Sequence, residues 1–198
     1  MPLDRFMDKA LNKDVIEYLK GSKHKAWNEN KLLGNQAENI IEYLINSMPN
    51  WRCMKFGIET HIKEIKDMVK KSVTPTTAKI RKMPDFIAFN EKTSEAFFIE
   101  VKSFSKPQYG TYIFNYLEDY NKYWEGTKLI IVRPNKPYFI YVDLEKIEGT
   151  MKSLIQTRNG FKAYWSLGGI EQKIKKLFPD LKDEKIEKAI GMIPQIKT

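Results

Sequence analysis

The sequence is poor in the residues that form disulfides and zinc sites. It contains a single cysteine, Cys53, and only two histidines, His24 and His61. One cysteine cannot form a disulfide within the chain, and it excludes a zinc site built from several thiolates. The two histidines lie far apart in sequence and leave little material for a zinc hydrolase. We therefore expect a protein of a reducing compartment.

Long apolar runs and nucleotide-binding loops are also missing. No apolar stretch approaches the roughly 18 residues of a membrane span, and the start, Met-Pro-Leu-Asp-Arg, does not have the pattern of a signal peptide. No glycine-rich phosphate-binding loop occurs, so nothing favours a nucleotide cofactor. The sequence thus predicts a soluble, cytoplasmic protein (in a host's cytoplasm if a virus encodes it) with neither a membrane nor a nucleotide cofactor as partner.

What the chain does have is apolar material and positive charge. Its 198 residues are 42% hydrophobic and 13% aromatic, which is enough for the core of one sizeable domain. The 34 Lys and Arg outnumber the 25 Asp and Glu, for a net charge of +9. Such a charge is typical of nucleic-acid-binding proteins, because phosphate neutralisation releases counterions. A lysine-rich host proteome is an equally good explanation on composition alone.

The hydrophobic pattern predicts an α/β fold on a mixed sheet, in a single domain over residues 1–198. The predicted helices cover residues 3–20, 35–48, 60–71 and 112–124, and the predicted strands cover residues 51–58, 85–89, 96–103, 128–132 and 138–142. Residues 72–83 are predicted to be a basic loop. The domain then divides into an N-terminal helical extension (1–33), a core (34–143) with a basic insertion (59–83), and a mainly helical C-terminal extension (144–198).

One predicted hairpin brings acidic residues together. If Lys92 and Thr93 form a two-residue turn, each pair of facing residues has numbers that sum to 185, so Asp85 lies directly opposite Glu100. Facing side chains share a face of the sheet, and Lys102, two residues after Glu100, projects from the same face. The other pairs in this register are apolar, as in strands buried inside a sheet.

Two adjacent carboxylates at the end of an apolar strand pair should repel each other, and their desolvation is costly. A divalent cation between Asp85 and Glu100 would remove this conflict, and hard oxygen ligands favour Mg²⁺ or Mn²⁺. Such a site, with Lys102 beside it, is suited to phosphodiester hydrolysis. An ordinary solvated strand end is the alternative, since an Asp followed by Glu-x-Lys also arises by chance in a chain that is 30% charged.

These residues resemble the motif of the PD-(D/E)XK nuclease superfamily, which appears here as Pro84-Asp85 and Glu100-Val101-Lys102. The resemblance covers about residues 34–142. It implies a restriction-endonuclease-like αβββαβ core with a central mixed sheet flanked by helices, extended here by N- and C-terminal helices. It also implies Mg²⁺ (or Mn²⁺) held by Asp85, Glu100 and the Val101 carbonyl, with Lys102 as a catalytic residue.

Many members of the superfamily carry a further glutamate in the helix before the first core strand, and Glu38 matches it. An equally good interpretation is that Asn35 is the N-cap of this helix and Glu38 completes a capping box. Glu42, one turn later, is an alternative site residue.

The insertion over residues 59–83 departs from the superfamily's pattern and is basic. Because it ends beside Asp85, it could guide a phosphate backbone into the site, although each lysine could equally lie on a solvated surface. The residues that we expect to contact nucleic acid are Lys79, Arg81, Lys82 and Lys106. The aromatic residues of 112–124 could stack on bases, but their helical spacing favours packing in the core.

The resemblance implies a metal-dependent DNA endonuclease, and the small basic chain is similar to Holliday-junction resolvases, which act as homodimers. The alternatives are a restriction-type or repair exonuclease and a non-catalytic nucleic-acid-binding module that kept the fold.

Overall fold

The computed structural model describes residues 34–56, 67, 69, 71–72, 74–103, 113–114, 120, 122–149, 152–157, 160–166 and 172–194. The predicted helix over residues 3–20, most of the predicted helix over residues 60–71, and Lys106 lie outside these ranges.

The centre of the fold is a six-stranded mixed sheet in the order β1-β2-β3-β5-β6-β9. Its strands are β1 (Trp51–Lys55), β2 (Phe86–Asn90), β3 (Ala96–Ser103), β5 (Lys128–Val132), β6 (Phe139–Asp143) and β9 (Gln172–Lys173). Only β3 and β5 run parallel, while the other neighbours are antiparallel. The predicted α/β class and mixed sheet are confirmed.

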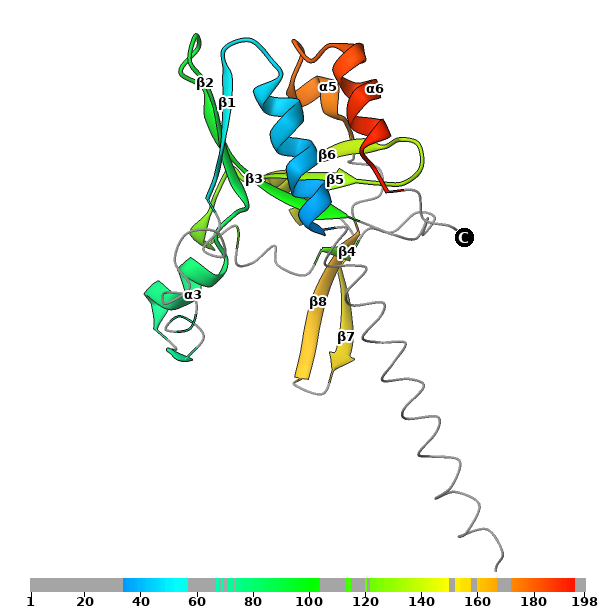
Figure 1. Cartoon of the computed structure of the whole chain (residues 1–198). Coiled ribbons are helices and arrows are strands. Elements are labelled where there is room, and N and C mark those ends of the chain that lie inside the picture. The colour runs from blue at the N-terminus through cyan, green and yellow to red at the C-terminus, as the bar shows by residue number, and fades with distance from the viewer. Residues whose placement is uncertain are drawn as a thin grey trace, which may run out of the picture.

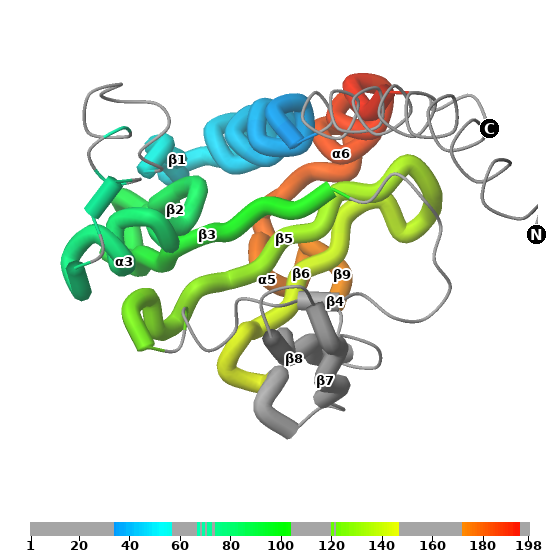
Figure 2. Tube along the Cα trace, turned by 90° about the horizontal axis from the view of Figure 1, so that it is seen from below, coloured from blue at the N-terminus to red at the C-terminus, as the bar shows by residue number. Residues whose placement is uncertain are grey.

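Helices cover one face of this sheet. The helix over residues 34–46, α5 (Ile174–Leu177) and α6 (Asp183–Gly191) lie on the same side, as Figures 1 and 2 show. Apolar residues recur along the first helix at helical spacing and are at most 2% exposed: Ala37, Ile40, Ile41, Leu44 and Ile45. No helix within the described ranges is both long and apolar enough to cross a membrane.

Two predictions fail where a second, three-stranded sheet forms in the order β4-β8-β7. Its strands are β4 (Ile113–Phe114), β7 (Lys152–Thr157) and β8 (Gly160–Ser166). The predicted helix over residues 112–124 is therefore wrong at its start, and the prediction of a mainly helical C-terminal part misses strands β7 and β8 in its described residues. The Asn159-Gly160 dipeptide, which favours tight turns, is a sequence signal for a break between β7 and β8, and Gly160 begins β8 opposite Thr157.

The predicted loop over residues 72–83 contains the helix α3 (Pro75–Arg81). Thr74 caps this helix, because its side chain accepts a hydrogen bond from the Thr77 amide and the Thr77 hydroxyl accepts one from the Thr74 amide. Pro75 suits the first helical position, where no amide hydrogen is needed. The proline that suggested a loop therefore begins a helix. Figure 1 shows α3 at one end of the molecule, away from the helix over residues 34–46.

Candidate metal centre and active site

The β2–β3 hairpin has the register expected from the sequence. Phe86 pairs with Ile99 and Phe89 with Ala96, so the numbers of facing residues sum to 185. The two-residue turn at Lys92 and Thr93 is wrong, however. The loop spans residues 91–94, closed by a hydrogen bond from the Asn90 amide to the Glu95 carbonyl (2.8 Å). The register survives because this loop also has an even number of residues.

Continuing the register by two residues places Pro84 opposite Val101 and Asp85 opposite Glu100. Pro84 has no amide hydrogen to donate to the Val101 carbonyl. The Val101 amide donates instead to Asp85 Oδ2, at 2.7 Å. Since the N–H and C=O of a strand residue point to the same side, the Val101 carbonyl is directed toward the Asp85 side of β3. The proline therefore leaves a backbone oxygen beside the carboxylates without its usual ladder donor.

Glu100 and Lys102 contact each other on the same face of β3. The Lys102 ammonium donates to Glu100 Oε1. Glu100 is buried, with 5% of its surface exposed, whereas the side chain of Lys102 is 37% exposed. The second oxygen, Glu100 Oε2, is buried and has no hydrogen-bond partner within the described part of the chain. A buried carboxylate oxygen without a partner is costly, so this atom indicates a place for a cation or another donor.

The surroundings of Asp85 shift its pKa strongly. Burial, followed by the neighbouring Glu100 carboxylate, raises the pKa of Asp85 from 3.8 to about 8. Lys102 and the hydrogen bond from the Val101 amide oppose this increase in pKa but do not cancel it. The free carboxyl group therefore holds a proton at neutral pH. A divalent cation would favour the ionised form of Asp85.

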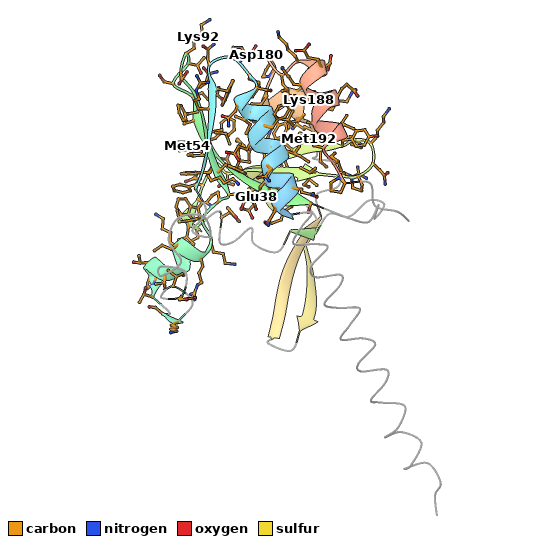
Figure 3. All side chains as sticks on the ribbon, in the orientation of Figure 1. Glu38, Met54, Lys92, Asp180, Lys188 and Met192 are labelled. Carbon is orange, nitrogen blue, oxygen red and sulfur yellow. The ribbon has the colours of Figure 1, made fainter. Side chains whose placement is uncertain are left out.

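Glu38 lies at the N-terminal end of the helix over residues 34–46 (Figure 3), close enough for its charge to act on Asp85. Its charge makes the smallest of the contributions that raise the pKa of Asp85. Residues 34 and 35 are already helical, so Asn35 is not the N-cap and the capping-box interpretation of Glu38 is wrong. Glu42, the alternative site residue, forms an ion pair with Lys55 of β1 at 3.6 Å.

An aromatic wall that the sequence did not reveal borders the carboxylates. The Phe56 amide donates to the Asp85 carbonyl (2.8 Å), which continues the β1–β2 register and places Phe56 beside Asp85. The Phe56 ring packs against Phe98 (5.4 Å between centroids) and against Trp124 (5.4 Å). Rings beside a carboxylate limit its access to water, which agrees with the desolvation of Asp85. The hairpin alone could have indicated Phe98, which is two residues before Glu100 on the same face.

The basic residues of the insertion have structural contacts of their own. Arg81 donates to the carbonyls of Val69 (3.2 Å) and Ser72 (3.3 Å), so its guanidinium helps to hold the insertion together. Lys79 is exposed and lies over the Trp124 ring, 5.1 Å from its centroid. Lys82 is half-buried. Lys106, the fourth residue expected to contact nucleic acid, lies outside the described residues.

The donor set at the hairpin fits a hard divalent cation. It consists of the Asp85 carboxylate, the Glu100 carboxylate with its unpartnered Oε2, and the Val101 carbonyl. All are oxygen atoms, which Mg²⁺ and Mn²⁺ prefer. Within the ranges that the structure describes, no three His, Cys, Asp or Glu side chains gather as a metal-ligating group. Water or substrate oxygens would complete the coordination.

Comparison with known proteins adds no relative to this geometry. No family model matches the chain, and neither a curated protein nor a solved structure matches it. The functional argument therefore depends on the residues of the site themselves.

Proposed function

We propose that this protein is a divalent-metal-dependent nuclease that hydrolyses phosphodiester bonds in DNA. The observation that carries this proposal is the side-by-side placement of Asp85 and Glu100, with Glu100 Oε2 buried and unpartnered and Lys102 on the same face. A purely structural role gives no reason for two desolvated acidic groups at the end of an apolar strand pair. The PD-(D/E)XK resemblance and the restriction-endonuclease-like core are part of this proposal.

Asp85, Glu100 and the Val101 carbonyl would hold the cation. When bound, Mg²⁺ or Mn²⁺ supplies a Lewis acid for a phosphate oxygen and lowers the pKa of a coordinated water. The chain's own part is to keep these oxygens fixed. The amide of Val101 orients the Asp85 carboxylate, and burial inside the strand pair orients Glu100.

Lys102 has the second catalytic role. Its ammonium lies against Glu100 Oε1, so it is next to the oxygens that would hold the cation. From there it orients a nucleophilic water and offsets the negative charge that develops on the phosphate during attack. Glu38 contributes charge to the same site from the neighbouring helix.

The net charge of +9 supports a polyanionic substrate. It supports the non-catalytic alternative, a nucleic-acid-binding module, equally well. The carboxylate pair favours the enzyme, because phosphate binding alone requires cations and gains nothing from buried acids. The test described below also distinguishes the kinds of nuclease. Its possible outcomes are structure-specific cleavage by a homodimer, as in Holliday-junction resolvases, and restriction-type or exonuclease activity.

The test is to incubate supercoiled, linear, single-stranded and four-way-junction DNA with the protein in Mg²⁺, Mn²⁺ or EDTA. We expect metal-dependent cleavage, with nicking of the supercoiled circle if the enzyme is an endonuclease. The variant Asp85→Asn should retain DNA binding and lose cleavage. Uncut substrates in every metal, or unchanged cutting by Asp85→Asn, would defeat the proposal.

Glu91→Gln provides a matched control. Glu91 is a carboxylate in the loop of the same hairpin, but it is exposed and pairs with Arg52 at 3.3 Å. Removing its charge should leave cleavage unchanged, because solvated surface pairs contribute little.

A further inference from the structure

The aromatic wall beside the carboxylates combines rings with lysines. Trp124 lies at the centre of the cluster, in contact with Phe56 (5.4 Å) and with Phe98 (5.2 Å), at steep angles of 87° and 75°. All three side chains are half-buried, so the cluster is a wall at the surface and not a closed core. Tyr120, from the same segment of the chain, is by contrast only 3% exposed.

The strand registers place this wall directly against the proposed metal centre. On one face of the sheet, Phe56, Asp85 and Glu100 follow one another across β1, β2 and β3. Phe98 lies two residues before Glu100 on that face, about 7 Å away along the strand. Trp124 contacts both Phe56, which pairs with Asp85, and Phe98, so its ring lies on this face of the sheet.

Lysines lie over the rings of two residues that are adjacent in sequence, Tyr123 and Trp124. Lys79 of α3 lies 5.1 Å from the centroid of Trp124, and the indole Nε1 donates to the Lys79 carbonyl at 3.2 Å. Lys122 lies 5.0 Å from the centroid of the half-buried Tyr123. Both lysines are exposed. An exposed lysine over a ring at the protein surface is held only weakly, so each lysine can move to a phosphate when a base takes its place on the ring.

We propose that Trp124, assisted by Tyr123, binds an unpaired nucleotide next to the phosphate that is cut, while Lys79 and Lys122 pair with the flanking backbone. The substrate is then DNA with an unpaired strand at the cleavage site. Stacking on aromatic rings combined with lysines along the backbone is the general means of binding single strands. A base inside a duplex is already stacked on both sides and cannot use the ring. This inference depends on the proposed function for the position of the cut.

The test measures binding without cleavage, by fluorescence anisotropy of labelled oligo(dT) and of a labelled duplex of the same length, in EDTA. Trp124→Leu removes the ring and should weaken oligo(dT) binding by between about fivefold and about 100-fold, with less than about a twofold change for the duplex. Trp124→Phe keeps a stacking surface and should stay within about threefold of the wild type. Tyr123→Leu, at a separate ring, should show a smaller loss in the same direction, which keeps the test valid if Trp124→Leu folds poorly.

Lys79→Met and Lys92→Met form a matched pair for the charges. Lys92 is exposed, and Figure 3 shows it at the tip of the β2–β3 hairpin, away from Glu38. Lys79→Met should lower the salt dependence of oligo(dT) binding by close to one counterion, and Lys92→Met should not.

The outcomes separate this inference from the nuclease proposal. No binding of oligo(dT) by the wild type, an equal loss for single strand and duplex, or no loss in Trp124→Leu would overturn the nucleotide-binding role, even if metal-dependent cleavage is present. Selective loss of oligo(dT) binding in Trp124→Leu supports the role, even if no substrate is cut.

Discussion

The two faces of the β2–β3 hairpin are made by alternate residues of the same strands, yet they differ in chemistry. Phe86 and Ile99 face the helix over residues 34–46 and are fully buried in the apolar core. Their immediate neighbours, Asp85 and Glu100, face the other way and form the carboxylate pair. Successive side chains of a strand point to opposite faces of the sheet. Residues that stabilise the core and residues of the proposed site can therefore alternate along the same strand.

The largest effect that we expect on stability lies on the helix-covered face. Phe86→Ala removes a fully buried ring and should lower the free energy of unfolding by about 3–5 kcal/mol. Urea denaturation followed by circular dichroism measures this loss. Met54→Ala is the control, because Met54 lies in the adjacent strand but is 55% exposed (Figure 3), and it should change the free energy by less than about 0.5 kcal/mol. Similar losses in both variants would remove the distinction between the two faces.

Glu100→Gln should have its main effect on catalysis. We expect the cleavage rate to fall by roughly 100- to 1,000-fold, since the variant loses a charged oxygen at the proposed metal centre. The free energy of unfolding in EDTA should not fall, because the substitution also removes a buried charge next to Asp85. Rates are measured on supercoiled DNA, beside Glu91→Gln. A rate close to that of the wild type would show that Glu100 only supports the fold.

The raised pKa of Asp85 predicts a specific pH dependence of stability. In the unfolded chain this carboxyl ionises near pH 4, whereas in the folded protein it keeps its proton until about pH 8. Between these values the folded state binds more protons, so stability falls as pH rises. The side chain of Asp85→Asn does not titrate, so the variant lacks this loss of stability. Its free energy of unfolding should exceed that of the wild type by an amount that grows with pH across this window, by at most about 1.4 kcal/mol for each pH unit.

The measurement is urea denaturation of the wild type and Asp85→Asn in EDTA at several pH values. The difference should be close to zero below about pH 4 and level off above about pH 8. A difference that does not vary with pH would show that Asp85 has an ordinary pKa.

Mg²⁺ should stabilise the folded protein through the carboxylate face alone. At ten times its dissociation constant, an ion that binds only the folded state adds about 1.4 kcal/mol. Thermal unfolding with and without Mg²⁺ measures this gain. It should persist in Glu91→Gln and disappear in Glu100→Gln. An equal gain in Glu100→Gln would place the ion elsewhere.

The smallest effect concerns Cys53 on the helix-covered face of β1. Burial raises the pKa of its thiol to about 12, with a smaller contribution from Glu42. Only the thiolate reacts readily, so iodoacetamide at pH 8 should leave Cys53 unmodified in the folded protein and modify it in urea. Mass spectrometry of the protein after brief labelling checks this. Rapid labelling without urea would mean that this face opens.

The hairpin could be predicted from the sequence because its register depends only on residues that are close together in the chain. An apolar strand on each side and an even number of loop residues were enough to place Asp85 opposite Glu100, although the turn itself was wrong. Within the described residues the first helix and strands β1, β5 and β6 were also predicted, since each has a strong periodic or continuous apolar pattern.

The failures have physical reasons. α3 was missed because Thr74-Pro75 was interpreted as a break and not as a helix start. Strands β7 and β8 were missed because the Asn159-Gly160 signal was not used. The wall formed by Phe56 and Trp124 could not be predicted, because it depends on which strand pairs with β2 and on where the chain returns after β3. The local hydrophobic pattern reveals neither the pairing of β2 nor the path of the chain after β3.

The most direct test of the central claim, that Asp85 and Glu100 share one divalent cation, is a crystal soaked in Mn²⁺ and measured for anomalous scattering. The account predicts a single strong peak between the two carboxylates, within coordination distance of Glu100 Oε2 and the Val101 carbonyl. Anomalous density elsewhere on the protein, with none at this pair, would contradict it.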